Sequence, residues 1–184
     1  MFKGFVTCAY GVHTVGRVLI VFGVCDALAS VGFASIIKMT GRVPIFILGA
    51  FINLAVIIVM LTWTPTLASV PGLLSVHVYI LAHFLFFFLV VYVLAALWGT
   101  GDAIWQTQIN ALYGVLFASD EEAAFSNYRL WESLGFVVAF ITQACGVCVF
   151  PKLILTIVAL TVGMAGYLFI EFLEHKKVKT QRNE

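Results

Sequence analysis

The chain has 184 residues, of which 62% are hydrophobic and only 10% are charged, and its mean hydropathy is +1.09. Soluble globular domains carry roughly 25% charged residues, so this composition argues against a soluble protein. The net charge of +1 argues against nucleic acid as a partner, because phosphate binding needs a basic surface. The composition therefore predicts an all-α polytopic protein embedded in the lipid bilayer.

Five segments are long and apolar enough to cross a bilayer, which takes about 20 residues in a helix. They lie at residues 14–37, 43–63, 77–117, 125–149 and 153–173. Polar or proline-bearing breaks separate them, at residues 38–42, 65–75, 120–122 and 151–152. We expect one transmembrane bundle over residues 1–174 and a basic tail over 175–184. The first segment is expected to be retained rather than cleaved as a signal peptide, because His13 and Arg17 interrupt its apolar run.

Segment 77–117 is much longer than one membrane span. At 1.5 Å per residue, a continuous helix over this segment would measure about 60 Å, twice the hydrocarbon thickness. Gly99 and Gly101 mark a point where the segment could divide. A separate second span would be short and rich in amides, and it would move the basic tail to the outer side. We expect one long or broken helix, with two spans as the alternative.

Lysine and arginine gather on one side of this predicted topology. That side carries Lys38, Arg42, Arg129, Lys176, Lys177, Lys179 and Arg182, whereas the other side carries Lys3 and Lys152. Short cytoplasmic loops are enriched in basic residues, so the C-terminus is predicted to be cytoplasmic. We expect the plasma membrane rather than an endosomal membrane.

A polar stripe interrupts the apolar third segment in the stretch "WGTGDAIWQTQINALYG", residues 98–114. At 100° per residue, Asp102, Gln106, Asn110 and Tyr113 share one helical face, and Gln108 points the opposite way. A carboxylate within a membrane normally faces a bundle interior or a water-filled cavity. The stripe is therefore predicted to face inward.

The other segments offer four candidate interhelix partners for this stripe. They are Arg17, Asp26, Arg129 and Glu132, and the last two stand at i, i+3 on one helical face. Two roles remain open for the stripe: a structural or gating ladder of hydrogen bonds, which we favour, or direct ligand contact with Asp102 as an ion or proton relay. Glu171 and Glu174, beside the basic tail, are expected to be solvated.

No catalytic motif, cofactor site or metal site is predicted. The sequence contains no nucleophile elbow, no H-E-x-x-H and no phosphate-cradling glycine loop, and its four histidines are dispersed. Its four cysteines stand in apolar surroundings, which favours a structural role as small apolar residues over a disulfide framework or a zinc site. We do not expect an enzyme.

The stretches "GDAIWQTQINALYGVLF" and "EEAAFSNYRLWESLGFVVAF" closely resemble the unc-93 family, a branch of the major facilitator superfamily, and most of all its A-type members. The stretch "CDALASVGFASIIKMTGR" also fits this family. The superfamily's loop motif is only partly present, since Lys38 stands where an aspartate is usual, which argues against loop gating. The resemblance implies a partial major facilitator fold of about five transmembrane helices, equivalent to spans eight to twelve.

The resemblance also implies a function and a set of partners. A chain of spans eight to twelve lacks the N-terminal half of the fold, which would supply the other wall of a central cavity. We therefore expect a fragment or a short natural product. The resemblance implies an accessory or regulatory protein of ion channels, particularly potassium channels, or of membrane receptors. The alternative is part of a secondary transporter that couples ion or proton movement to an unknown solute.

Overall fold

The computed structural model of the protein describes residues 12–62 and 76–182, and these residues form five helices and no strand. The helices are α2 (Val12–Thr40), α3 (Arg42–Thr62), α4 (Val76–Leu116), α5 (Glu121–Ala144) and α6 (Val149–Arg182). The break expected at residues 65–75 and the residue Lys3 lie outside the described residues. The protein is therefore all-α, as its composition predicts.

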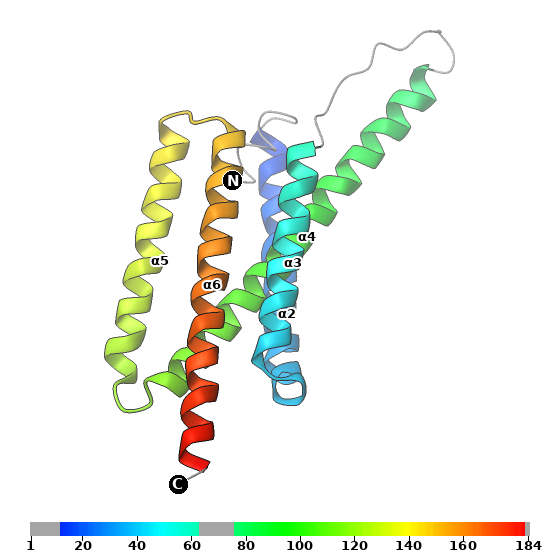
Figure 1. Ribbon diagram of the computed structural model, residues 1–184. Coiled ribbons are helices and arrows are strands. Elements are labelled where there is room, and N and C mark those ends of the chain that lie inside the picture. The colour runs from blue at the N-terminus through cyan, green and yellow to red at the C-terminus, as the bar shows by residue number, and fades with distance from the viewer. Residues whose placement is uncertain (1–11, 63–75, 183–184) are drawn as a thin grey trace.

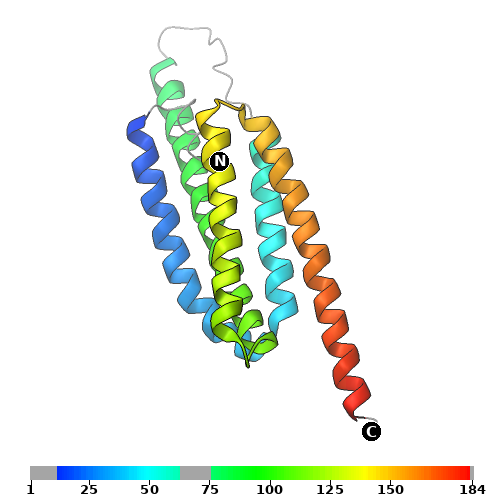
Figure 2. The ribbon, with the colours of Figure 1, turned by 90° about the vertical axis from the view of Figure 1, so that its left-hand side faces the viewer.

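The helices form an open bundle arranged around α4. Figure 1 shows α4 running obliquely between α3, which lies in front of it, and α2, which lies behind it, with α5 and α6 on the other side of the bundle. Helix α4 packs mainly against α2 and α3, α6 packs against α3, and α5 makes its contacts with α4. Figure 2, turned by 90°, shows α5 in front of the other helices and shows the C-terminal end of α6 extending beyond them. The long segment 77–117 is thus a single continuous helix.

Glycine ends two of the helices by adopting a positive φ angle. Gly41, between α2 and α3, has φ 83°, and its amide donates to the carbonyl of Ile37 at 3.0 Å. Gly146 has φ 66° and lies in the turn between α5 and α6. The break between these two helices therefore lies at this turn. The sequence-based prediction that it lies at residues 151–152 is wrong, because both residues belong to α6. Pro151 lies in the first turn of α6, where a helix tolerates proline because the missing amide has no intrahelical partner.

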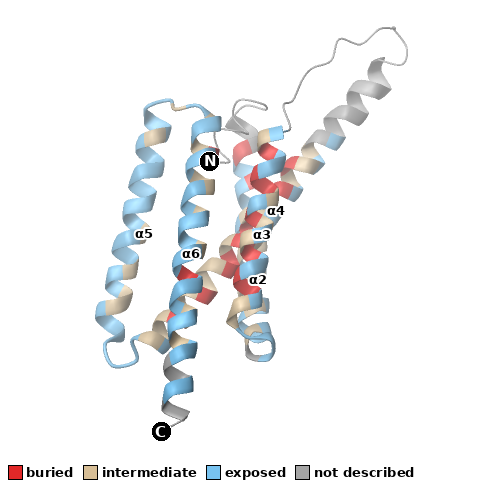
Figure 3. Ribbon diagram, in the orientation of Figure 1, coloured by how far each residue is buried: buried red, intermediate tan, exposed pale blue. Residues whose placement is uncertain are grey.

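The buried core lies where α2, α3 and α4 meet (Figure 3). One cluster consists of Val15, Val18, Val56, Ile57, Met60, Val91, Leu94, Ala95 and Leu153. A second cluster joins Phe46 of α3, Leu112 of α4 and Tyr167 of α6, and the rings of Phe46 and Tyr167 stack with their centroids 3.7 Å apart. No residue of α5 is buried. Packing therefore fixes four helices firmly and leaves α5 at the periphery.

Helix α6 continues through most of the predicted tail and ends at Arg182. Lysine, glutamine and arginine all have high helix propensity, so the basic sequence can extend the helix. Within α6, Glu171 lies 3.6 Å from the guanidinium of Arg42 at the start of α3, and both side chains are mostly buried. The expectation that Glu171 is solvated is therefore wrong, because the ion pair joins α3 to α6.

Four of the described helices are long and apolar enough to cross a membrane. The qualifying stretches are Val15–Ile37, Arg42–Thr62, Phe88–Leu116 and Val149–Lys176. Helix α5 is outside this set, and its first half carries Glu121, Glu122, Arg129 and Glu132. The protein is thus an integral membrane protein, and the crossing expected at residues 125–149 stays a prediction.

Candidate functional site

The polar face of α4 meets α5 through the side chain of Gln106. Its Nε2 donates to Oε1 of Glu132 at 2.9 Å, and its Oε1 accepts from the Tyr128 hydroxyl at 3.1 Å. Tyr128 and Glu132 stand at i, i+4 on α5, so one amide can bond to both. The two bonds use both ends of the amide and link α4 to α5 through partly buried groups.

Glu132 also bonds within its own helix. Arg129 Nη1 donates to the second carboxylate oxygen of Glu132, and the guanidinium carbon lies 5.2 Å from the centroid of the Tyr128 ring. Arg129 is 60% exposed at its side chain, whereas Glu132 is 18% exposed. The arginine therefore neutralises the Glu132 carboxylate from the outer side of α5 while Gln106 holds it from the inner side.

Asp102 is half-buried on α4, one turn before Gln106. It lies within electrostatic range of two further carboxylates, those of Asp26 on α2 and Glu132 on α5. One oxygen of Asp26 is buried and accepts no hydrogen bond from any residue that the structure describes. Three helices therefore bring three carboxylates toward one region of the bundle, and only Glu132 has a cation beside it in the described chain.

The stripe ends at Tyr113, within a group of aromatic rings at the α4–α5 turn. Its ring centroid lies 5.5 Å from that of Phe117, 5.5 Å from that of Tyr128 and 6.2 Å from that of Phe125. These distances suit edge-on and offset aromatic packing. Asn110, between Gln106 and Tyr113 on the same face, is half-buried. Gln106 and Tyr113 thus contact α5, while Asp102 and Asn110 are half-buried on the same face of α4.

Two residues lie away from this network. Arg17 is exposed on α2 and forms no ion pair with any described residue, so it is not brought to the stripe. Gln108 is fully buried on the opposite face of α4, and neither end of its amide has a hydrogen-bond partner among the described residues. It shares a face with Ile104, which packs against Gly49 of α3.

Tyr128 is the one member of the network that the sequence reasoning missed. Its spacing of four residues before Glu132 places both side chains on one face of α5, but this spacing does not say which residue of α4 they meet. The arrangement offers a hydrogen-bonded link between two helices and, beside it, a half-buried carboxylate at Asp102 that has no ion pair with any described residue. It can hold helices together, or bind and release a cation or a proton.

The fold and this network define a class: an α-helical integral membrane protein with a polar network between its helices. A family model described as "Ion channel regulatory protein UNC-93" matches residues 9–167. The chain belongs to the UNC-93 family. That description names a regulatory protein rather than an enzyme.

Several curated relatives are similar over nearly the whole chain. "Protein unc-93 homolog A" of Danio rerio is 42% identical over 99% of this chain and 35% of its own length. The Homo sapiens protein of that name is 41% identical over 95% of this chain and 34% of its own. "Putative potassium channel regulatory protein unc-93" of Caenorhabditis elegans is 35% identical over 94% of this chain and 22% of its own. The chain spans about a third or less of their length, and no solved structure matches it significantly.

Proposed function

We propose that this chain acts as a regulatory subunit of a potassium channel and binds its partner through the exposed first half of α5. The family description and the Caenorhabditis elegans relative's name both refer to channel regulation. The observation that carries the proposal is the character of α5, which buries no residue and is held to the bundle by a polar network. We place it in the plasma membrane with a cytoplasmic C-terminus.

The first half of α5 has the composition of a protein-binding surface rather than a lipid-facing one. Asn127, Arg129 and Ser133 are exposed there beside Leu130 and Trp131, which are 59% and 66% exposed. Exposed polar and charged groups are costly in lipid and normally meet protein or water. Tryptophan and arginine are also the residues most enriched at energetic centres of interfaces. This surface therefore suits a partner that offers both polar and aromatic contacts.

Trp131→Ala is expected to reduce recovery of the partner channel by about thirtyfold, because an interface tryptophan often contributes about 2 kcal/mol. The measurement is co-purification of the chain with each member of a panel of potassium channels, together with the current density of the co-expressed channel. The matched control is Phe169→Ala on α6, where an aromatic residue of similar exposure, 63%, lies on an apolar helix face.

Equal loss of channel recovery in both variants, or no channel recovered with the unchanged chain, contradicts the proposal.

The N-terminal half of the same fold is the other protein segment that we propose as a neighbour of this bundle. A blot of native membranes separates the two arrangements: a product near 20.2 kDa requires a separate partner, and a longer product requires that Trp131→Ala be repeated in the longer form.

The carboxylates of Asp26, Asp102 and Glu132 support a second candidate function, a relay for protons or cations in a secondary transporter. Ionisable groups inside a membrane commonly mark ion pathways. Asp102→Asn is expected to abolish pH-driven proton uptake into proteoliposomes containing the protein and to leave channel recovery intact. Glu174→Gln, at the far end of α6, is the control. Proton uptake that survives Asp102→Asn eliminates the relay.

A further inference from the structure

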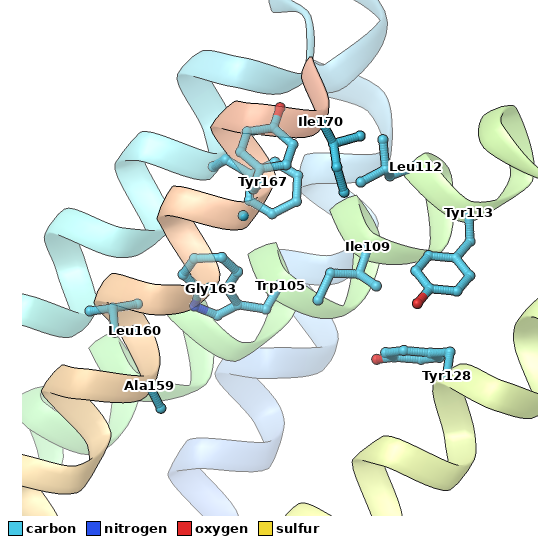
Figure 4. Close-up of a pocket in the computed structure, with 12 residues that line it drawn as sticks. Trp105, Ile109, Leu112, Tyr113, Tyr128, Ala159, Leu160, Gly163, Tyr167 and Ile170 are labelled. Carbon is cyan, nitrogen blue, oxygen red and sulfur yellow. The ribbon is translucent and has the colours of Figure 1, made fainter. Parts of the chain in front are cut away.

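A cavity of about 470 Å³, open to the outside, lies between α4, α5 and α6 and borders the Gln106 amide network through Tyr128 (Figure 4). Trp105 and Ile109 form its α4 side, Tyr128 faces them from α5, and Gly163 and Tyr167 belong to its α6 side. Its volume falls within the range of small-molecule sites. The lining is apolar and aromatic, and no charged side chain of the described residues takes part in it.

Glycines on α6 keep this cavity open. A Cβ atom added at Gly163 or Gly166 would meet no atom within 4 Å, so neither glycine serves a close helix contact. The next residue, Tyr167, is held by its stacking on Phe46. The α6 wall of the cavity thus consists of the fixed ring of Tyr167 and of glycines that have no side chain. The cavity therefore results from how the helices pack.

The surroundings of the cavity indicate where an occupant comes from. Its α4 and α6 residues lie inside stretches apolar enough to cross a membrane. Because the cavity opens beside these stretches and its lining is apolar, the available occupant is a membrane lipid. Its polar groups include two tyrosine hydroxyls, both pointing toward the space between α4 and α5 in Figure 4. The Tyr128 hydroxyl donates to Gln106, whereas the Tyr113 hydroxyl has no hydrogen bond to any residue that the structure describes.

We propose that this cavity binds a sterol-class lipid, with the flat ring system between Trp105 and α6 and the single hydroxyl at Tyr113. A phospholipid headgroup is disfavoured because no cationic side chain of the described residues lines the cavity to pair with its phosphate. The nearby cation, Arg129, is already paired with Glu132. An uncharged head of one hydroxyl and a rigid apolar body match the unpaired hydroxyl of Tyr113 and the aromatic walls.

The test uses a photoactivatable sterol that carries an alkyne tag, added to the complete chain in phosphatidylcholine liposomes. Labelled peptides are expected from α4 and α6 around Trp105 and Gly163, and excess unlabelled cholesterol should suppress them. Gly163→Leu fills the cavity and should lower this labelling about tenfold. Gly135→Leu on α5 is the matched control, because a Cβ there also meets no atom within 4 Å and the residue does not line the cavity.

A second variant keeps the proposal testable if Gly163→Leu does not fold, as judged by circular dichroism and gel filtration. Tyr113→Phe retains the ring and removes the hydroxyl. It should weaken labelling by the photoactivatable sterol, and it should leave labelling by the same probe without its hydroxyl unchanged. Labelling that is unchanged in Gly163→Leu or in Tyr113→Phe overturns the sterol site. The sterol site is also overturned if a photoactivatable phospholipid labels the protein as strongly as the sterol does and loses this labelling in Gly163→Leu. That result would assign the cavity to an acyl chain.

Discussion

Gly99→Ala is expected to destabilise the protein by about 1–3 kcal/mol, the usual effect of overpacking. A Cβ atom at Gly99 would collide with the backbone carbonyl of Phe22 on α2 and lie 3.2 Å from the amide nitrogen of Asp26. Both neighbours are main-chain atoms within a helix, so no side-chain rotation can make room. Helices α2 and α4 would have to move apart, with loss of the packing between them. The free energy of unfolding in detergent micelles, titrated with dodecyl sulfate, measures this effect.

Gly114→Ala on the same helix is the matched control. No atom lies within 4 Å of a Cβ there, so alanine adds no contact. Because alanine has the higher helix propensity, this variant should be as stable as the unchanged chain or up to about 1 kcal/mol more stable. Destabilisation of both variants to the same extent would mean that glycine flexibility, rather than the α2–α4 contact, is what matters at Gly99.

The two central glycines of α4 show how far the sequence predicts this fold. Apolar length and polar breaks predict the helices, but the sequence also marks Gly99 and Gly101 as a point of division of the long helix. The structure explains these glycines by close packing: Gly99 lies against α2, and Gly101 lies against Asn53 of α3. Small residues at helix crossings are typical of membrane bundles. A single sequence cannot separate the two explanations, because a break and a close contact both favour glycine.

The candidate site was predictable within a helix and much less so between helices. Helical geometry alone places Asp102, Gln106, Asn110 and Tyr113 on one face, and it places Arg129 and Glu132 together on α5. Which residue of one helix meets which residue of another depends on crossing angles and register, which periodicity does not contain. For this reason the contact of Gln106 with Tyr128 and the contact of Arg42 with Glu171 emerge only from the structure.

Gln106→Met is expected to release α5 from the bundle. Methionine has a similar length, but it forms neither the bond to Glu132 nor the bond from Tyr128. Interhelical hydrogen bonds in membranes contribute about 0.6 kcal/mol on average and up to about 1.7, so losing two costs about 1–3 kcal/mol. Since α5 buries no residue, little apolar packing compensates. Spin labels at Phe140→Cys and Val162→Cys, both exposed in the unchanged chain, should show a broadened α5–α6 distance distribution in electron resonance.

Glu132→Gln separates hydrogen bonding from charge. The new amide oxygen can still accept from Gln106, while the ion pair with Arg129 is lost, so the distance distribution should stay near that of the unchanged chain. If the α5–α6 distance distribution broadens equally in both variants, charge neutralisation by Arg129 is what holds α5. If the distribution stays narrow in Gln106→Met, the amide of Gln106 is not needed to hold α5.

Because Trp131 lies between Tyr128 and Glu132 in the sequence, release of α5 should also disorder the proposed channel-binding surface. Gln106→Met should then lower channel recovery without altering any residue of that surface.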